Sequence, residues 1–248
     1  MRTVVVGASS GLGRCIAISL GQRGARVALL ARRKERLVDA AKEAGPGAAA
    51  IACDVTEPSS CRDAIDEAAS SLGSIDALVY SAGVGPLRRL VDLDADTWRH
   101  TFATNVTGAA LVTAAAIPYL TASRGAAAYL TSVSASLTPP WPGLAAYTVS
   151  KAALDKLVEA WRAEHPAVGF TRVIVGDCAG GEGPSMTEFA AGWDSKLAAE
   201  VAPVWVARNY LSGSLLEVDE LVRVVETVLR CGASASIPTV AVTPRPRS

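Results

Sequence analysis

The first twenty residues constrain the fold of the chain more than any other segment. A β-branched run over residues 3–6 leads into a glycine turn spaced G-x-x-x-G-x-G, and the apolar spacing of a buried helix follows over residues 15–20. A strand, a glycine turn and a helix in this order form a dinucleotide-binding unit, because glycines let the backbone approach a pyrophosphate at the helix N-terminus. Such turns also arise by chance, so the turn alone does not decide whether the chain binds a cofactor. The residues expected to contact it are Gly7, Ser9, Ser10, Gly11, Leu12 and Gly13.

Strands and helices alternate along the rest of the chain. Strands are predicted over 3–7, 26–31, 48–53, 76–81, 126–132, 170–176 and 238–243, and helices over 12–23, 34–44, 58–72, 95–121, 144–164 and 218–231. This alternation predicts an α/β fold, a single Rossmann domain over 1–248 with a doubly wound parallel sheet of about seven strands and helices on both faces. The ligand of such a fold binds at the carboxyl ends of the strands.

Composition excludes several classes of protein. The chain has 24 Lys and Arg and 24 Asp and Glu, so its formal net charge is zero and no basic block indicates nucleic acid. No uninterrupted apolar stretch reaches the roughly 20 residues of a membrane span, and the immediate first strand leaves no room for a signal peptide. Five scattered cysteines indicate reduced thiols and no metal site. We therefore expect a cytoplasmic protein without nucleic-acid or membrane partners.

A second group of residues carries candidate chemistry. Tyr147 and Lys151 are four residues apart, which places them on one helix face about 5–6 Å apart, and Ser134 lies thirteen residues before Tyr147. A free phenol has a pKa of about 10, and a neighbouring ammonium favours the phenolate and brings that pKa toward neutrality. A Tyr-x-x-x-Lys pair by itself is usually an ordinary helix surface, so its weight comes from the glycine turn that precedes it.

Together these features resemble the short-chain dehydrogenase/reductase family over nearly the whole chain. The order of motifs carries the resemblance: the glycine turn, Asp54-Val55, Ser81-Ala82-Gly83, Asn105-Val106-Thr107-Gly108, and the set Ser134, Tyr147 and Lys151. The resemblance implies that Tyr147 transfers a proton to the substrate oxygen, Lys151 lowers the pKa of Tyr147, and Ser134 stabilises the oxygen. Ser132 and Ser136 flank Ser134, and the thirteen-residue spacing selects Ser134.

The resemblance also assigns the remaining candidates. Asn105 would hold a water that relays protons to Lys151, although a buried Asn needs a hydrogen-bonding partner in any case. Asp54 would bind the adenine amino group, with Val55 against the ring. Residues 81–83 stand where the family usually has Asn-Ala-Gly and would lie beside the cofactor ribose. The Ser at the first of these positions is expected to change the bracing of the sheet more than the chemistry.

The end of the second predicted strand indicates the nucleotide. Ala31 stands where a carboxylate would hold a 2′-hydroxyl, and Arg32, Arg33 and Lys34 follow it. A carboxylate would repel a 2′-phosphate, whereas a guanidinium can bind it through two hydrogen bonds. The alternative is a solvated helix start, but cations oppose the dipole at a helix N-terminus. We therefore expect NADP(H), held by Arg32 and Arg33.

The chain departs from the family after the sixth predicted strand. There the usual Pro-Gly is replaced by residues 176–184, which we expect to be flexible, and Thr187 is expected to match a family Thr that contacts the carboxamide. Residues 178–215 are the expected substrate lid. Its apolar side chains predict an apolar or cyclic substrate, or else burial against the lid's own helices or another subunit; they are Met186, Phe189, Trp193, Val204, Trp205, Tyr210 and Leu211.

Two functions follow from the sequence. The first is an NADPH-dependent oxidoreductase, a homodimer or homotetramer, that reduces a ketone or aldehyde of an apolar small molecule to an alcohol or runs the reverse oxidation. The alternative is a non-catalytic protein that senses NADP(H) or binds a partner on the same fold. A sensor does not need the Tyr147 and Lys151 pair, which favours the enzyme, and only the altered loop after Gly176 favours the sensor.

Overall fold

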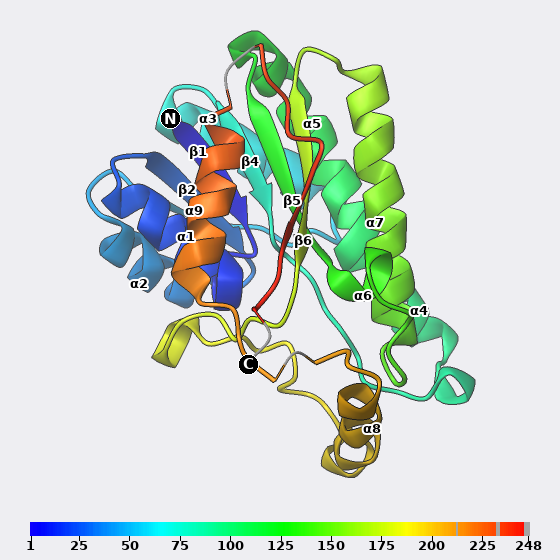
Figure 1. Cartoon of the computed structure of the whole chain (residues 1–248). Helices are drawn as coiled ribbons and strands as arrows, with labels where there is room; N and C mark the ends of the chain where they lie inside the picture. The colour runs from blue at the N-terminus through cyan, green and yellow to red at the C-terminus, as the bar shows by residue number, and fades with distance from the viewer. Residues whose placement is uncertain (212, 232–233, 246–248) are drawn as a thin grey trace.

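One parallel sheet organises the chain and confirms the predicted doubly wound α/β fold. The computed structural model describes residues 1–211, 213–231 and 234–245. Within them seven strands pair in parallel in the order β3-β2-β1-β4-β5-β6-β7 (Figure 1). The strands are β1 (Arg2–Val6), β2 (Arg26–Ala31), β3 (Ala49–Ala52), β4 (Ala77–Tyr80), β5 (Ala126–Ser132), β6 (Gly169–Val175) and β7 (Thr239–Val242). The expected domain, 1–248, and the expected lid, 178–215, include residues outside the described ones (212, 232–233 and 246–248).

Helices cover both faces of the sheet, because successive side chains of a strand point to opposite faces. In β1, Val4 and Val6 pack into one core with α3 (Pro58–Leu72), α5 (Gly108–Ser123) and α7 (Ala145–Glu164). Val5 packs into the second core, whose helices are α1 (Gly11–Gln22), α2 (Lys34–Ala44) and α9 (Val218–Leu229). All four strand residues of β4 are buried, as a central parallel strand requires.

Two helices were not predicted from the sequence. They are α6 (Val133–Ser136), directly after β5, and α8 (Ser195–Ala207), which lies beneath the carboxyl ends of the strands in Figure 1. Short helical turns also occur at η1 (Leu90–Asp92) and η3 (Gly183–Ser185). Asp194 caps α8 by accepting the Leu197 N–H, so the helix begins where a capping residue stands.

The predicted helix over 95–121 is a composite. It consists of α4 (Ala95–Phe102), the π-helical turn η2 (Ala103–Thr107) and α5. In the described part of the chain, the run Ala95–Ser123 is long and apolar enough to cross a membrane by length and composition alone, which qualifies the expectation from the sequence. Val112, Ala116 and Leu120 of this run are fully buried in the core against the sheet, the arrangement of a core helix.

The turn after β1 brings two distant segments together. Gly7 has a φ of +86°, and a Cβ at this position would lie 2.6 Å from the backbone nitrogen of Ala82. Gly13 is equally constrained, since its Cβ would lie 2.2 Å from Ser81 Oγ. The Ser81 hydroxyl donates to the carbonyl of Val6 at 2.5 Å, which ties the end of β4 to the end of β1. The glycine turn and residues 81–83 therefore share one crevice at the switch point of the sheet.

Gly7→Ala tests this close approach, with Gly24→Ala as its matched control. Gly24 has nearly the same φ, +85°, but no atom lies within 4 Å of the position that a Cβ would take there. Left-handed strain alone lowers the free energy of unfolding by about 1 kcal/mol at Gly24, whereas the clash at Gly7 is expected to raise that loss to about 3 kcal/mol or more. Urea unfolding of both variants measures the difference. Equal losses of unfolding free energy in the two variants would show that the backbone at Ala82 can move away from a Cβ at residue 7 without cost.

Candidate active site

A cavity of about 980 Å³ opens at the carboxyl edge of the sheet, between the glycine turn and α7. Most of the residues expected to bind a cofactor or react line this cavity: Gly7, Ser9, Ser10, Gly11, Leu12, Gly13, Arg32, Arg33, Asp54, Val55, Ser81, Ala82, Gly83, Ser134, Tyr147, Lys151 and Thr187. Asn105 lies behind the cavity wall and is fully buried. The topology thus gathers segments that are far apart in the sequence around one site.

Tyr147 and Lys151 both project from the first half of α7, and burial dominates their electrostatics. Burial raises the pKa of Tyr147 to about 12, and a hydrogen bond with the Ser132 side chain offsets only part of that rise. Burial also lowers the pKa of Lys151 to about 8, against the opposing influence of the Asp155 carboxylate. Lys151 Nζ donates to the carbonyl of Leu130 at 2.7 Å and lies 5.8 Å from the centre of the Tyr147 ring. The pKa of Tyr147 therefore shifts in the direction opposite to the expected lowering, because burial is the largest influence on it.

The hydroxyl that lowers the pKa of Tyr147 against the effect of burial is that of Ser132. Ser132 ends β5 and caps the short helix α6, where its Oγ accepts the Ser134 N–H at 3.2 Å. Ser134 Oγ lies 3.0 Å from Ser132 Oγ and accepts the Thr148 hydroxyl at 3.3 Å, so it stands one step further from the phenol. The thirteen-residue spacing takes no account of the helical turn α6, which lies between β5 and α7. The catalytic role of Ser134 stays a prediction, and both Ser132 and Ser134 line the cavity.

Asn105 sits in the π-helical turn, a distortion that frequently occurs at functional sites. Its Oδ1 accepts the Val84 N–H at 2.8 Å, and its Nδ2 donates to the Val84 carbonyl at 2.9 Å and to Ser150 Oγ at 2.8 Å. Asn105 Oδ1 and Lys151 Nζ both lie 3.5 Å from the Cβ position that Gly83 leaves empty. The side chain thus braces the segment beside Lys151, and Oδ1 keeps one lone pair for a further donor.

A basic cluster lies where the cofactor's phosphate was expected, but its members differ in part from the prediction. Arg33 Nη2 donates to Ser9 Oγ and to Ser10 Oγ, both at 2.9 Å, and so joins the end of β2 to the glycine turn. Arg36 completes the cluster through a carboxylate that it shares with Arg33. Sequence reasoning missed Arg36, although its three-residue spacing from Arg33 places both on one side of α2.

Arg32 lines the same cavity and acts electrostatically on Asp54. Burial alone would raise the pKa of Asp54, but hydrogen bonds from Thr56 hold it below its usual range, with a smaller contribution from Arg32. Asp54 Oδ1 accepts from the backbone N–H of Thr56 at 3.0 Å and from its hydroxyl at 2.7 Å. Val55 beside it is buried, so this corner offers one carboxylate and one apolar surface.

The segment after β6 forms a hairpin packed on the glycine turn. Gly180 and Met186 pair across it, and Gly181 N–H donates to the Ser185 carbonyl at 3.1 Å. Gly11 N–H donates to the Met186 carbonyl at 3.3 Å, and Thr187 Cα lies 3.4 Å from the Cβ position of Gly11. Thr187 therefore lies against the glycine turn in this structure, where a segment expected to be flexible forms defined backbone contacts.

Aromatic rings form a continuous series from Tyr147 into α8. Neighbouring centroids are 4.8–5.9 Å apart along the order Tyr147, Phe189, Trp193, Trp205, Trp141 and Tyr210. Trp205 is 5% exposed and does not line the cavity, so it is buried against its own neighbours. Trp141, Phe189 and Trp193 do line the cavity. Of the lid aromatics, Trp205 is thus buried within the protein, whereas Phe189 and Trp193 lie where a ligand in the cavity could contact them.

The hydrogen-bond donors of the site suit a dinucleotide phosphate. In this structure, oxygen atoms of the chain itself accept from these donors. The carbonyl of Met186 accepts the N–H of Gly11 at the start of α1, and the carboxylate of Glu188 binds Arg33. A helix N-terminus and an arginine are the groups that bind pyrophosphate and phosphate in proteins. The residues present therefore fit a phosphorylated dinucleotide.

Comparison with known proteins identifies the family. The family model for short chain dehydrogenase matches residues 2–189, so the chain belongs to the short-chain dehydrogenase/reductase family and is related to oxidoreductases. An 11-beta-hydroxysteroid dehydrogenase A of Sesamum indicum is 35% identical over 179 residues, which are 70% of this chain and 51% of that protein. The chain spans about half the length of the first curated relatives that it matches.

Two solved structures show the same fold. An alcohol dehydrogenase from Thermococcus sibiricus, complexed with 5-hydroxy-NADP, has a TM-score of 0.80 at 23% identity and covers 97% of this chain and 94% of its own. A 3-ketoacyl-(acyl-carrier-protein) reductase from Brucella melitensis, complexed with NADH, has a TM-score of 0.80 at 24% identity and covers 97% and 96%. These two proteins thus carry different nucleotides on a common architecture.

Lys151→Met tests the burial of an ionisable lysine. The pKa of Lys151 falls from 10.5 to about 8 on folding, so the unfolded chain binds more protons between these pH values and stability rises with pH across them. The variant lacks this rise. Its stability relative to the wild type should therefore be greatest near pH 7 and should decline by up to about 3 kcal/mol as the pH is raised through this window.

Chemical denaturation at a series of pH values measures this effect. Lys156→Met, at an exposed position of the same helix, is the control. The lost hydrogen bond to Leu130 shifts the whole curve of Lys151→Met without changing its slope. A stability difference that stays constant with pH would contradict the burial of the ammonium group.

Proposed function

We propose that the chain is an NADPH-dependent oxidoreductase that reduces a ketone or aldehyde of an apolar small molecule to an alcohol, or runs the reverse oxidation. The observation that carries this proposal is the meeting of Tyr147, Ser132 and Lys151 in the cavity that the glycine turn borders. Membership of an oxidoreductase family supports the reaction class. A bound nicotinamide would supply or accept the hydride.

The choice of NADPH rests on the end of β2. Ala31 provides no carboxylate for a 2′-hydroxyl, whereas Arg33 is already held against Ser9 and Ser10 by hydrogen bonds. A guanidinium fixed in this way loses little side-chain freedom when it binds a phosphate. Arg32 acts electrostatically on Asp54, so we assign the phosphate to Arg33 and the adenine end to Arg32, Asp54 and Val55.

Proton transfer falls to Tyr147. With its pKa raised to about 12, the phenol is protonated at neutral pH and can donate to a substrate oxygen. Lys151 stabilises the phenolate that results, because the ammonium lies on the ring side of the same cavity. The Ser132 hydroxyl hydrogen-bonds the same oxygen and stabilises charge that develops there. Ser134 orients Ser132 from behind.

The walls of the cavity support an apolar substrate. Leu87, Trp141, Leu144, Phe189 and Trp193 line the part of the cavity next to Tyr147. Residues 178–215 then serve as the substrate lid of a single domain. Large apolar and aromatic side chains with few polar groups are typical of sites for apolar ligands.

The protein's setting is also a proposal. We infer a cytoplasmic homodimer or homotetramer, with α4, α5 and α7 as the faces that meet. The Val149 side chain, in the second turn of α7, is 46% exposed and lies on one of these faces. The alternative is a non-catalytic NADP(H) sensor, which the hairpin across the glycine turn supports; nucleotide binding without turnover on any ketone would favour it.

Tyr147→Phe tests the proposed reaction. Removing the phenolic hydroxyl removes the proton donor while keeping the ring against Phe189, so ketone-dependent oxidation of NADPH should fall by about a hundredfold or more. Binding of NADPH, followed by fluorescence titration, should stay within about twofold of the wild type. Tyr119→Phe, whose hydroxyl contacts Asp66 far from the cavity, is the control. A near-normal rate for Tyr147→Phe would remove the mechanism.

A second prediction separates the two serines. Ser132→Ala should lower kcat by about a hundredfold, because it removes the hydroxyl next to Tyr147. Ser134→Ala should lower kcat by less than about tenfold, because Ser134 acts only through Ser132. Steady-state kinetics on a shared ketone compares them. A larger loss of kcat in Ser134→Ala than in Ser132→Ala would assign the stabilisation of the substrate oxygen to Ser134.

A third prediction concerns the nucleotide. Arg33→Ala should weaken NADPH binding by about tenfold or more, since it removes charge-assisted hydrogen bonds to the 2′-phosphate, and should change NADH binding by less than about twofold. Arg32→Ala, at the neighbouring position, should have the smaller effect on NADPH. Calorimetric titration of both nucleotides measures each change. Equal losses for NADPH and NADH in Arg33→Ala would be incompatible with a phosphate role.

A further inference from the structure

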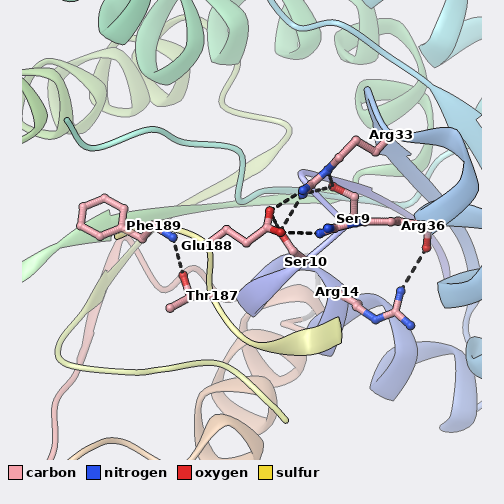
Figure 2. A network of polar contacts seen from close by, with 8 residues as sticks. All are labelled: Ser9, Ser10, Arg14, Arg33, Arg36, Thr187, Glu188 and Phe189. Carbon is pink, nitrogen blue, oxygen red and sulfur yellow. Dashed lines mark hydrogen bonds and ion pairs between the residues drawn. The ribbon is translucent and has the colours of Figure 1, made fainter. Parts of the chain in front are cut away.

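The carboxylate of Glu188 occupies the basic cluster beside the glycine turn (Figure 2). Its Oε2 pairs with Arg33 Nη1, and its Oε1 pairs with Arg36 Nη1 at 2.5 Å. The hydroxyl of Ser10 donates to Oε2 at 3.4 Å. One anionic side chain from the segment after β6 thus contacts two guanidiniums and a hydroxyl from elements more than 150 residues earlier in the chain.

These contacts are the ones that a 2′-phosphate would need. Arg36 and Arg33 hold the pKa of Glu188 below its usual range, so the side chain carries a full negative charge at neutral pH. A phosphate monoester carries about 1.5–2 negative charges and three acceptor oxygens, so it competes well for the same donors. A 2′-hydroxyl carries no charge and cannot replace the carboxylate.

The Glu188 contacts are weak enough to be replaced. The side chains of Arg33, Arg36 and Glu188 are 41%, 45% and 39% exposed. Ion pairs at this exposure are screened by water and salt, and each one contributes little to stability. The carboxylate is therefore an exchangeable occupant of the cluster.

The neighbours of Glu188 in sequence lie in the same cavity. Two residues before it, the Met186 carbonyl accepts the N–H of Gly11, the first residue of α1. The next residue, Phe189, stacks edge-on against Tyr147 with centroids 4.8 Å apart, and its ring fills the space that Gly85 leaves. Residues 186–189 therefore run from the glycine turn, past the arginines, to the proposed proton donor.

We propose that Glu188 is a specificity-determining residue that holds the Arg33 and Arg36 pair until the 2′-phosphate of NADPH replaces it. The inference rests on the proposed function, since it concerns the nucleotide of that site. Glu188 then weakens NADPH binding through direct competition and leaves NADH binding unaffected.

The test compares the wild type with Glu188→Gln by calorimetric titration with NADPH and with NADH at fixed salt. Glu182→Gln, an exposed glutamate of the same hairpin, is the matched control. Glu188→Gln keeps the size of the side chain and removes its charge, so it should tighten NADPH binding by about three- to tenfold and change NADH binding by less than about twofold. The control should bind both nucleotides as the wild type does.

Three other results would overturn the inference, and they differ in what they imply for the proposed function. If the wild type prefers NADPH and Glu188→Gln binds it no more tightly, the competition is absent while the proposed nucleotide stands. Equal tightening for NADPH and NADH would mean that Glu188 only anchors the hairpin, without contesting the phosphate. If both proteins prefer NADH or bind neither nucleotide, the phosphate site itself fails and the proposed function fails with it.

Discussion

The backbone contact between Gly7 and Ala82 is the constraint on which the rest of the site depends. It brings the turns after β1 and β4 together at the point where the order of the strands reverses. A side chain at Gly7 would separate these two turns, and the crevice between them would close or shift. Because β5 pairs with β4 in register, the end of β5 then delivers Ser132 to the same edge of the sheet. The position of the end of β5 in the site thus depends on the contact between the turns after β1 and β4.

Burial sets the chemistry of the site as much as the identity of its residues. It disfavours both the phenolate of Tyr147 and the ammonium of Lys151, so the structure keeps the phenol as an acid and weakens the charge on the lysine. The residues around the pair compensate through hydrogen bonds, as when Lys151 donates to the carbonyl of Leu130. The phenol of Tyr147 is thus a proton donor with a raised pKa.

Local patterns could be predicted from the sequence, and contacts between distant segments could not. The first strand followed from its β-branched run, and the Tyr147 and Lys151 pair followed from helix spacing, because both depend on a pattern within one element. Ser134 was preferred to Ser132 because a residue count cannot show that the chain forms an extra helical turn. Arg36 had a detectable spacing from Arg33, but nothing in the sequence pointed to Glu188 as their partner. That pairing depends on how the hairpin after β6 folds back, and its composition matches no periodic pattern.

The ring series between Tyr147 and Tyr210 gives the molecule an optical property of its own. Three of its members are tryptophans, and one of them, Trp193, lies edge-on against Phe189, the residue that covers Tyr147. Any movement of Phe189 changes the surroundings of the Trp193 indole, which contacts the Trp205 ring. The intrinsic emission of the protein is therefore a reporter of the state of its cavity, with no dye or label attached.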